Sequence, residues 1–470
     1  MDCNNIRQRI TPFMDDLLAE DEYQRVWGHL ESCASCGQFA ASVGTLSYRL
    51  KELGAVIDIG HDAKNMIGAQ YVVYSSAIQE DNPEINEARK KRLPILKRAK
   101  LLANLMREHQ GITIAGAHGK TTTTSMIAHL LIKAGLNPTT AVGGIVSGTK
   151  SNARLGDGKY FVSEVDESDG SFLYFTPKYS IITNIDYEHL DYYKNWNAIL
   201  NAYQEFIGRT QKDGMLFVFG EDEYLSKISK DSRIPFQRYG FSSANNICAV
   251  DVHFNHFSSD YECLVDGKKL GRIELNVPGK HNILNSLACV GLGLKLNIPF
   301  QIIQQSLSAF KEVKRRFELL ADVKGIRIVD DYAHHPTEIK ATLEAASRVN
   351  KKRLVVVFQP HRYTRLKSLF KEFTQSLKHV DYLMVTDVYA ASEKPIAGIN
   401  AKNFVVRMKE ISKNEIVYVK KEDIIPRLHK ISGDGDFIVM LGAGDITKIA
   451  HDFADQLRIS SSHHETAGKS

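Results

Sequence analysis

The segment Gly111-Ile-Thr-Ile-Ala-Gly-Ala-His-Gly-Lys-Thr-Thr-Thr-Thr124 decides the fold class of this 470-residue chain. A short apolar run leads into a glycine-containing turn and then into a helical pattern. The apolar residues of that pattern share one face: Met126, Ile127, Leu130, Leu131 and Ala134. Glycine allows backbone amides to close around phosphate oxygens, and the N-terminus of a helix favours anions. The segment therefore predicts a strand, a phosphate-binding loop and a helix in succession.

The residue types in this loop suit a nucleotide site. Gly116 and Gly119 shape the turn, Lys120 can reach the outer phosphates, and the hydroxyl of Thr121 can hold Mg²⁺. The loop is shorter than the usual pattern, because Ile114 stands where that pattern has its first glycine. A glycine turn with a chance lysine is the alternative. The coincidence of strand, loop, Lys-Thr pair and amphipathic helix argues against it.

Apolar runs continue to alternate with helical patterns along the chain, which is typical of α/β domains with largely parallel sheets. The predicted strands are Ile112–Ala115, Tyr160–Ser163, Tyr179–Ile185, Met215–Phe219, Ile326–Val329, Leu354–Phe358, Tyr382–Thr386 and Phe437–Leu441. Polar residues gather directly after most of these runs. Because open α/β sheets bind ligands at the carboxyl ends of their strands, we expect the functional site there.

Two of these polar clusters are rich in carboxylates. The first is Ser163-Glu164-Val-Asp166-Glu167-Ser168-Asp169, and the second is Asn184-Ile-Asp186-Tyr-Glu188-His189-Leu-Asp191. Neighbouring carboxylates repel one another unless a cation is present, and Mg²⁺ takes oxygen ligands that it shares with nucleotide phosphates. The alternative for the first cluster alone is a solvated acidic turn. Two such clusters beside a phosphate loop favour a shared metal site.

Composition excludes several other classes of protein. The chain is 43% hydrophobic and 24% charged, as in ordinary globular proteins, and its net charge of +5 gives no case for a nucleic-acid binder. No apolar stretch reaches the ~18 residues of a membrane span, and the N-terminus has no apolar signal segment. We therefore expect a cytoplasmic protein with no membrane or nucleic-acid partner. Cys248, Cys263 and Cys289 are expected to be isolated thiols.

The central motifs resemble those of the Mur ligase family. The loop Gly116–Thr124 is similar to the ATP loop of that family, and Glu164–Phe172 and Thr183–Asp191 are similar to its metal-site segments. Val277-Pro-Gly-Lys-His-Asn-Ile-Leu-Asn285 resembles the segment on the adenine side. Several ordered motifs are more specific than any one of them alone.

The resemblance extends in both directions from this centre. Asp330-Asp-Tyr-Ala-His-His-Pro-Thr-Glu338 resembles the motif that closes over the nucleotide, and Gln359-Pro-His-Arg-Tyr-Thr-Arg365 resembles the branch of the family that adds alanine. Upstream, Gly60-His61, Tyr74-Ser-Ser-Ala-Ile78 and Asp81-Asn-Pro-Glu84 look like the UDP-sugar domain. The similarity runs from about residue 43 to about residue 455.

The resemblance implies an α/β protein with three Mur ligase domains and a small helical module in front of them. The expected parts are a helical module at 1–42, a partial Rossmann-like UDP-sugar domain at 43–108, a central P-loop ATPase domain at 109–312, a Rossmann-like amino-acid domain at 313–459 and a disordered tail at 460–470. The implied activity, in peptidoglycan precursor synthesis, joins L-alanine to the carboxylate of UDP-N-acetylmuramate through an acyl phosphate, with ATP and Mg²⁺. No enzyme nucleophile is needed, because catalysis rests on positioning and charge neutralisation.

The resemblance also assigns individual residues. The implied ATP contacts are Gly116, Ala117, His118, Gly119, Lys120, Thr121, Thr122, His281, Asn282, Asn285, Arg316 and Asp331. The implied Mg²⁺ ligands are Thr121, Glu164 and His189, and the implied catalytic residues are Lys120, Glu164, His189, Arg362 and Arg365. The substrates would be held by Ser75 and Ser76 on the UDP-sugar and by His361, Arg362 and Arg365 on the alanine and the acyl phosphate.

Some of these assignments have a purely structural alternative. His334 precedes His335 and Pro336, so its role could be limited to capping a helix. Arg362 and Arg365 are three residues apart and could form an exposed helix face. The bidentate geometry of guanidinium with carboxylate or phosphate favours the functional interpretation.

The N-terminus departs from the family pattern. Before residue 54, glycine occurs only at positions 28, 37 and 44, so the family's glycine-rich turn is missing. In its place stand Cys3 and His29-Leu-Glu-Ser-Cys33-Ala-Ser-Cys36, which resemble the zinc-binding domain of anti-sigma factors. One histidine and three cysteines (Cys3, His29, Cys33 and Cys36) make a closed tetrahedral Zn²⁺ set, and the alternative is free cytosolic thiols.

Three functions follow from this departure. The first is an active alanine-adding ligase whose head is either a true fusion or a rearranged reading frame. The second is a zinc-binding regulatory or partner-binding protein with an inactive ligase portion, whose N-terminal module contacts another protein. The third is a ligase for a related substrate such as a preformed peptide, which the His361-Arg362 pair and Arg365 disfavour.

Overall fold

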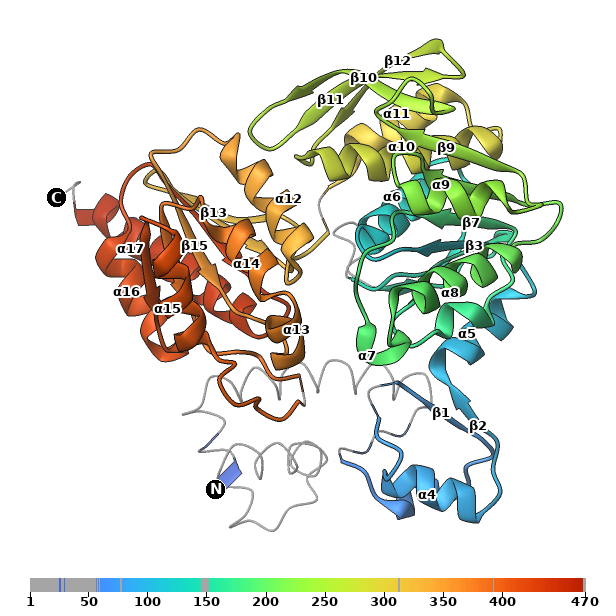
Figure 1. Ribbon diagram of the computed structural model, residues 1–470, viewed down its shortest axis with the longest axis horizontal. Coiled ribbons are helices and arrows are strands. Elements are labelled where there is room, and N and C mark those ends of the chain that lie inside the picture. The colour runs from blue at the N-terminus through green and yellow to red at the C-terminus, as the bar shows by residue number, and fades with distance from the viewer. Residues whose placement is uncertain are drawn as a thin grey trace. The chain divides into compact units, whose positions relative to one another are not determined.

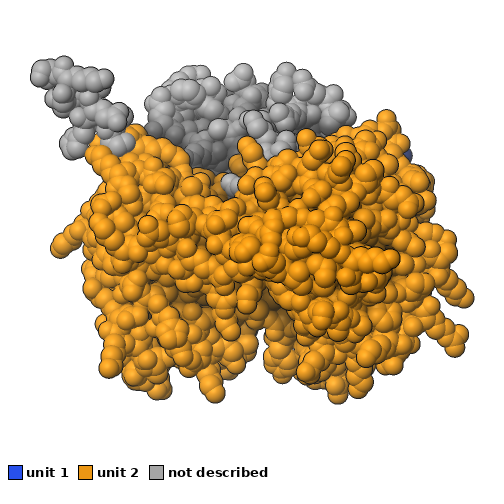
Figure 2. Space-filling model, turned by 90° about the horizontal axis from the view of Figure 1, so that it is seen from above, with its two compact units in different colours: residues 1–102 blue, residues 103–470 orange. Residues whose placement is uncertain are grey.

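The computed structural model forms two compact units, residues 1–102 and residues 103–470 (Figure 2). The described residues are 60–76, 78–144, 152–311, 313–391 and 393–467, together with Arg25, Val26, His29, Val56 and Asp58. Cys3, Cys33 and Cys36 lie outside them, so the zinc site stays a prediction. Among the described residues, no helix is long and apolar enough to cross a membrane.

The first unit contains a small parallel β-sheet. Strand β1 (Val72–Tyr74) pairs with β2 (Ile95–Lys97), and the connection between them contains helix α4 (Pro83–Lys90). The amide oxygen of Asn82 caps α4 by accepting from the amides of Glu84 and Ile85. A short 3₁₀ turn (Ala63–Met66) precedes β1, and α5 (Arg98–Met106) follows β2. Ser75 and Ser76 directly follow β1, at the carboxyl end of a parallel strand, where the UDP-sugar contacts were expected.

The second unit contains a ten-stranded sheet, which builds what we call the central domain (Figure 1). Its order is β12-β11-β10-β9-β8-β7-β3-β6-β4-β5. The strands are β3 (Gln110–Ala115), β4 (Thr139–Ala141), β5 (Ala153–Arg154), β6 (Tyr160–Glu164), β7 (Tyr179–Ile182), β8 (Met215–Phe219), β9 (Phe236–Gly240), β10 (Ile247–Phe254), β11 (Ser259–Val265) and β12 (Lys268–Leu275). Strand β3 lies between β6 and β7, and all three are parallel. The phosphate loop and both carboxylate clusters therefore follow the carboxyl ends of three neighbouring parallel strands, so they lie close together.

Helix α6 (Lys120–Lys133) starts directly after Gly119 and packs against α10 (Lys280–Lys295) and the sheet. Four of the apolar residues predicted on its inner face are buried, and Ala134 packs partly buried against the same core. Burying each large apolar side chain stabilises the fold by about 1.5–3 kcal/mol. The remaining elements of this domain are the 3₁₀ turn Ser171–Tyr174, α7 (Leu190–Tyr193), α8 (Trp196–Gly208), α9 (Glu223–Lys230) and α11 (Phe300–Ala309).

A six-stranded sheet builds the C-terminal domain in the order β13-β14-β18-β15-β16-β17. The strands are β13 (Glu318–Val323), β14 (Ile326–Asp331), β15 (Arg353–Phe358), β16 (Tyr382–Val385), β17 (Glu415–Tyr418) and β18 (Asp436–Leu441). The helices are α12 (Pro336–Ser347), α13 (Tyr363–Ser368), α14 (Phe370–Leu377), α15 (Ala401–Ile411), α16 (Ile424–Ile431) and α17 (Ile446–Ala467), with a 3₁₀ turn at Lys421–Asp423. Only the edge strand β13 is antiparallel to its neighbour.

The two faces of this sheet have separate cores, with helices on both sides (Figure 1). Along β18, Val439 belongs to the core under α12, α14 and α15, whereas the next residue, Met440, belongs to the core under α16 and α17. Side chains of a strand alternate between faces, so a sheet covered on both faces needs a continuous apolar run. This requirement explains why the run Phe437–Leu441 contains no polar residue.

The eight predicted strands are all present, with small differences at their ends. Strand β7 ends at Ile182, three residues before the predicted Ile185, and β14 continues to Asp331. The sequence did not predict the antiparallel extension β10–β12, whose burial pattern is mixed rather than continuous. Helix α17 continues to Ala467, so the predicted disordered tail begins inside a helix. The three cysteines expected as isolated thiols are free and buried.

Candidate active site

The phosphate loop requires glycine at two positions. Gly116 has φ +128°, and a Cβ there would lie 2.1 Å from the hydroxyl oxygen of Thr183. Gly119 has φ +84°, and its Cβ would lie 2.6 Å from Oδ1 of Asn285. Left-handed backbone and close approach together exclude a side chain at either place. The loop is therefore pressed against the ends of β7 and α10.

Lys120 is held inside the loop as a buried cation. Its Nζ donates to the carbonyl oxygen of Gly116 at 2.5 Å and to Oε1 of Glu167 at 2.9 Å. Burial opposes the charge, but the carboxylates of Glu167 and Glu164 outweigh burial and raise the pKa of Lys120 above its usual range. Burial likewise opposes charge on Glu167, but Lys120 and His189 bring the pKa of Glu167 down to about 2. Lys120 is thus a fixed positive charge at the mouth of the loop.

The predicted metal ligands lie around the same loop. The hydroxyl of Thr121 donates to Oε2 of Glu164 at 2.9 Å, so these two oxygen ligands are neighbours. Nε2 of His189 lies 3.4 Å from Oε1 of Glu167, whose other oxygen is buried without a hydrogen-bond partner among the described residues. Hydroxyl and carboxylate oxygens suit Mg²⁺, and an unpartnered buried carboxylate oxygen suits a nearby cation. The donor set therefore fits the predicted ion.

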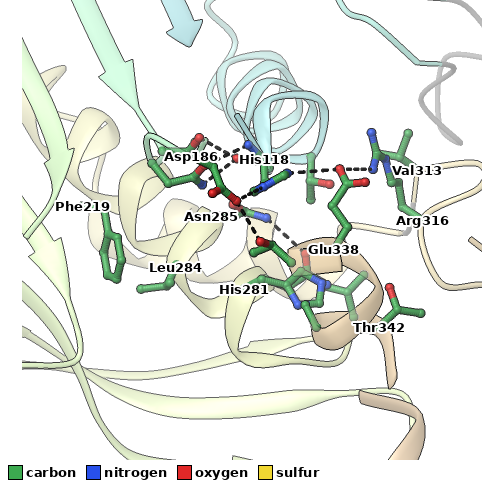
Figure 3. Close-up of a pocket in the computed structure, with 18 of the residues that line it drawn as sticks. His118, Asp186, Phe219, His281, Leu284, Asn285, Val313, Arg316, Glu338 and Thr342 are labelled. Carbon is green, nitrogen blue, oxygen red and sulfur yellow. Dashed lines mark hydrogen bonds and ion pairs between the residues drawn. The ribbon is translucent and has the colours of Figure 1, made fainter. Parts of the chain in front are cut away.

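A cavity of about 480 Å³ opens beside the loop. Figure 3 draws side chains of residues that line it. Eight of the predicted ATP contacts line it: His118, Gly119, Thr122, His281, Asn282, Asn285, Arg316 and Asp331. Its apolar wall includes Phe219, Tyr239 and Leu284, which offers a flat base a hydrophobic surface. The amide of Asn285 donates to Oδ1 of Asn282 at 3.3 Å, while its own oxygen accepts from Thr123 at 3.1 Å.

His118 links the phosphate loop to the C-terminal domain. Its Nε2 lies 2.8 Å from Oδ2 of Asp186, and its Nδ1 lies 3.4 Å from Oε1 of Glu338 (Figure 3). Burial opposes the imidazolium, but these two carboxylates outweigh burial and raise the pKa of His118 to about 10. The hydroxyl of Thr337 also donates to Oδ2 of Asp186 at 2.8 Å. Both ring nitrogens of His118 and Oδ2 of Asp186 therefore have partners among the described residues.

Asp331 and Arg316 sit at the wall of the cavity that the C-terminal domain supplies. Asp331 accepts from the amides of Phe317 at 2.8 Å and Ala333 at 2.7 Å, and burial raises its pKa to about 6. Nη1 of Arg316 lies 3.9 Å from Oε1 of Glu338. Two backbone amides therefore hold the carboxylate of Asp331 at the end of β14, and its predicted contact with ATP stays a prediction.

The predicted amino-acid residues lie at the start of α13. Nη1 of Arg365 donates to Nδ1 of His361 at 2.9 Å, so His361 is neutral. Burial and the nearby cationic groups lower the pKa of His361 to about 3. Arg362 has φ +67°, a strained conformation for a side chain with a Cβ. The side chain of Arg365 is only 15% exposed, so the alternative of an exposed helix face is wrong.

His335, and not His334, caps the start of α12. His335 is the N-cap residue: its Nδ1 accepts from the amide of Thr337, and Glu338 completes a capping box. His334 instead places its ring 5.3 Å from that of His361 and its Nδ1 3.2 Å from Oε2 of Glu338. The capping alternative for His334 is therefore wrong, because Pro336 takes the first helical position and the cap must precede it directly.

Several residues of the site were quoted in motifs without a role. Glu167 pairs with Lys120, and Asn184 holds His118 by accepting from its amide and donating to its carbonyl oxygen, both at 2.9 Å. Glu338 contacts two other residues that line the cavity, His118 and Arg316. The signal that could have found them is their place within the strand-end clusters, because sequence alone does not say which side chain of a cluster points inward.

Models of the Mur ligase family match three successive stretches of the chain. The Mur ligase family catalytic domain matches residues 39–110, the Mur ligase middle domain residues 114–293, and the Mur ligase glutamate ligase domain residues 315–444. The chain belongs to the Mur ligase family, in accord with the three-domain α/β fold that the sequence predicts.

Similar proteins indicate which branch of that family this chain resembles. The chain is 42% identical over 414 residues to a UDP-N-acetylmuramate–L-alanine ligase of Geotalea uraniireducens, covering 88% of this chain and 90% of the relative. It is 41% identical over 412 residues to the protein of that name in Aquifex aeolicus, covering 87% and 89%. A solved UDP-N-acetylmuramate-alanine ligase from Thermotoga maritima aligns with a TM-score of 0.74 at 31% identity, covering 87% and 90%.

Proposed function

We propose that this chain is an ATP-dependent ligase that joins L-alanine to the carboxylate of UDP-N-acetylmuramate in peptidoglycan precursor synthesis. The names of relatives above 40% identity support the substrates. The observation that carries the proposal is the position of the alanine-branch motif. Nη2 of Arg365 lies 3.8 Å from Oε1 of Glu188, the residue next to His189, whose ring reaches Glu167 and thereby Lys120. Amino-acid and phosphate groups would therefore meet in one place.

The reaction has two steps. One oxygen of the muramic acid carboxylate attacks the γ-phosphorus of ATP, the bond from phosphorus to the ADP oxygen breaks, and an acyl phosphate forms. The neutral amine of alanine then attacks the acyl carbon, the carbon–oxygen bond to phosphate breaks, and the nitrogen loses a proton. Both steps develop negative charge on phosphate oxygens, which fixed cations stabilise.

Each part of the site has a task in this reaction. Lys120 and the loop amides bind the outer phosphates, while Thr121, Glu164 and His189 would hold Mg²⁺, which neutralises phosphate charge when bound. Arg365 would hold the alanine carboxylate, and Arg362 would hold the acyl phosphate. His361 accepts from Arg365 through Nδ1, so its Nε2–H is left to donate to a substrate.

The remaining predictions belong to the same proposal. The UDP-sugar would bind residues 43–108 through Ser75 and Ser76, residues 109–312 would bind ATP, and residues 313–459 would bind alanine. ATP and UDP-sugars are cytoplasmic metabolites, so we place the reaction in the cytoplasm. Zinc at Cys3, His29, Cys33 and Cys36 would be an addition to this machinery, and metal analysis of the purified chain tests it.

The test is phosphate release from ATP and Mg²⁺ with UDP-N-acetylmuramate and L-alanine supplied together and singly. Release that requires both substrates supports the ligase. Release with a preformed peptide in place of alanine would favour the related-substrate alternative. ATP binding without release under any combination would contradict the proposal and favour a regulatory protein with an inactive ligase portion, above all if the chain carries stoichiometric zinc.

A further inference from the structure

Glu188 is a buried carboxylate surrounded by donors that do not reach it. Its side chain is 8% exposed, and among the described residues Oε1 has no hydrogen-bond partner. Nε2 of His335 lies 3.6 Å from Oε1, and Nη2 of Arg365 lies 3.8 Å from it. The other oxygen, Oε2, lies 3.6 Å from Nε2 of His189. All three separations exceed the 2.7–3.2 Å of a formed N–H···O bond.

Two of these donors come from the C-terminal domain, whereas Glu188 belongs to the central domain. Nδ1 of His335 accepts from the amide of Thr337, so a neutral His335 carries its proton on Nε2, the nitrogen that faces Glu188. Burial lowers the pKa of His335 to about 4, which keeps the ring neutral. An approach of the C-terminal domain by less than about 1 Å would bring both donors within hydrogen-bonding distance.

Arg365 is oriented from two sides. Nη1 donates to His361, and Nη2 faces Glu188. A guanidinium has five N–H donors in one plane, so two directed toward protein acceptors leave three for a ligand. Fixing the plane from two sides determines where a bidentate carboxylate can bind. Leaving a buried carboxylate oxygen without a hydrogen-bond partner is unfavourable, so Oε1 of Glu188 favours the approach of Arg365.

We propose that Glu188 is a positioning residue for the amino-acid substrate: its carboxylate orients the guanidinium of Arg365 and so ties binding of the amino-acid carboxylate to the approach of the C-terminal domain. The inference rests on the proposed function, because it assumes that Arg365 binds the amino acid. Glu188 itself touches no substrate. Its loss should therefore affect the amino-acid step and spare the step that uses ATP.

The experiment compares Glu188→Gln with the unchanged full-length chain in two assays. The first is the KM for L-alanine, and the second is acyl phosphate formation, trapped as a hydroxamate with hydroxylamine in place of alanine. Hydroxylamine has no carboxylate, so it does not need Arg365. We expect the KM for alanine to rise at least about tenfold, the loss of one charge-assisted hydrogen bond, while hydroxamate formation and the KM for ATP stay unchanged.

A double-mutant cycle with Arg365→Lys tests the coupling across the domains. If Glu188 acts through Arg365, Glu188→Gln adds little to the alanine KM of Arg365→Lys, whereas independent effects multiply. Glu410→Gln removes an exposed carboxylate that pairs with Arg407 at 3.4 Å on α15, and it should change neither assay. Glu188→Asp retains the charge and should form hydroxamate at the normal rate.

Three outcomes would overturn the inference. One is an unchanged KM for alanine in Glu188→Gln, and another is a pair of effects that multiply. The third is loss of hydroxamate formation in both Glu188→Gln and Glu188→Asp, which would assign Glu188 to the phosphoryl step beside His189. Failure of the unchanged chain to form any hydroxamate would instead contradict the proposed function.

Discussion

The phosphate loop and the amino-acid end of the site differ in how completely their polar groups are paired. In the loop, Lys120 meets Glu167 and Thr121 meets Glu164, both at 2.9 Å and both within the central domain. At the amino-acid end, the carboxylate of Glu188 faces its donors from the C-terminal domain at 3.6 and 3.8 Å. The groups proposed to act on phosphate are thus held within one domain, whereas those proposed to act on the amino acid depend on two domains.

The contacts between the central and C-terminal domains also differ from one part of their boundary to another. On the nucleotide side, the hydroxyl of Thr337 already donates to Asp186 at 2.8 Å, and His118 reaches Glu338. On the amino-acid side, the described residues form no comparable bond to Oε1 of Glu188. The nucleotide side of the boundary is therefore joined by hydrogen bonds, whereas the donors around Glu188 lie just beyond hydrogen-bonding distance. The predictions below test the two regions separately.

The largest effect is expected for Lys120→Met, which removes the cation of the loop. The carboxylates of Glu164 and Glu167 would lose their counter-charge, and the outer phosphates would lose a donor. Phosphate release should fall by about 10²–10³-fold or more. Lys269→Met is the matched control, because Lys269 is 71% exposed and pairs with Glu262 on the distant strand β11. Near-normal release in Lys120→Met would refute the assigned role of the loop.

A smaller effect should follow from Gly119→Ala. The new Cβ would lie 2.6 Å from Oδ1 of Asn285 and would displace the adenine-side amide, so the KM for ATP should rise about tenfold or more. Gly135→Ala is a close control, because Gly135 also has positive φ, +73°, but has nothing within 4 Å. It should lose about 1–2 kcal/mol of stability and keep its KM for ATP. Equal KM values in both variants would contradict the packing argument.

His118→Gln should change how stability depends on pH. The pKa of His118 is raised from 6.5 to about 10 in the folded chain, so its ion pairs stabilise the fold fully below pH 6.5. This contribution is lost as the pH rises through 10. The unfolding temperature of the unchanged chain should therefore exceed that of the variant by a few degrees at pH 6, and the difference should shrink toward pH 10. Thermal scans of both proteins across this range measure it, and a constant difference would show that His118 is not charged.

The smallest effect is expected for Thr337→Val, which removes one hydrogen bond on the nucleotide side of the boundary. An exposed bond of this kind contributes about 0.5–1.5 kcal/mol, so the KM for ATP should rise by no more than about tenfold. The KM for alanine should change less than in Glu188→Gln, if the two sides close separately. A larger rise in the alanine KM for Thr337→Val than for Glu188→Gln would contradict the proposed difference between the two sides.

The sequence predicts those parts of the site whose geometry is local. Gly119, Lys120 and Thr121 are neighbours in a loop, and their spacing alone predicts a phosphate-binding loop. Glu164 could be predicted as well, because β3 and β6 are parallel neighbours and the carboxyl ends of such strands meet. The antiparallel strands β10–β12 were missed because their partly exposed residues interrupt the continuous apolar run by which the other strands were predicted.

The sequence could not predict residues whose role depends on the direction in which their side chains point. Asp166, Glu167 and Asp169 lie in one cluster, yet only the fold shows that Glu167 turns inward to Lys120. His334 and His335 are adjacent, and only the start of α12 decides which one caps the helix. A sequence gives the residue types of a cluster but not the rotation of the backbone that carries them.

The sequence by itself determined the fold class, the order of the motifs and the chemistry of the phosphate loop, because strand periodicity and loop spacing are local properties of the chain. Only the tertiary structure decided which carboxylates face one another and where the two domains meet. Glu188 and Arg365 are 177 positions apart, and their distance of 3.8 Å results from the packing of two separate sheets. No local pattern encodes that packing, because it depends on the combined shape of both domains.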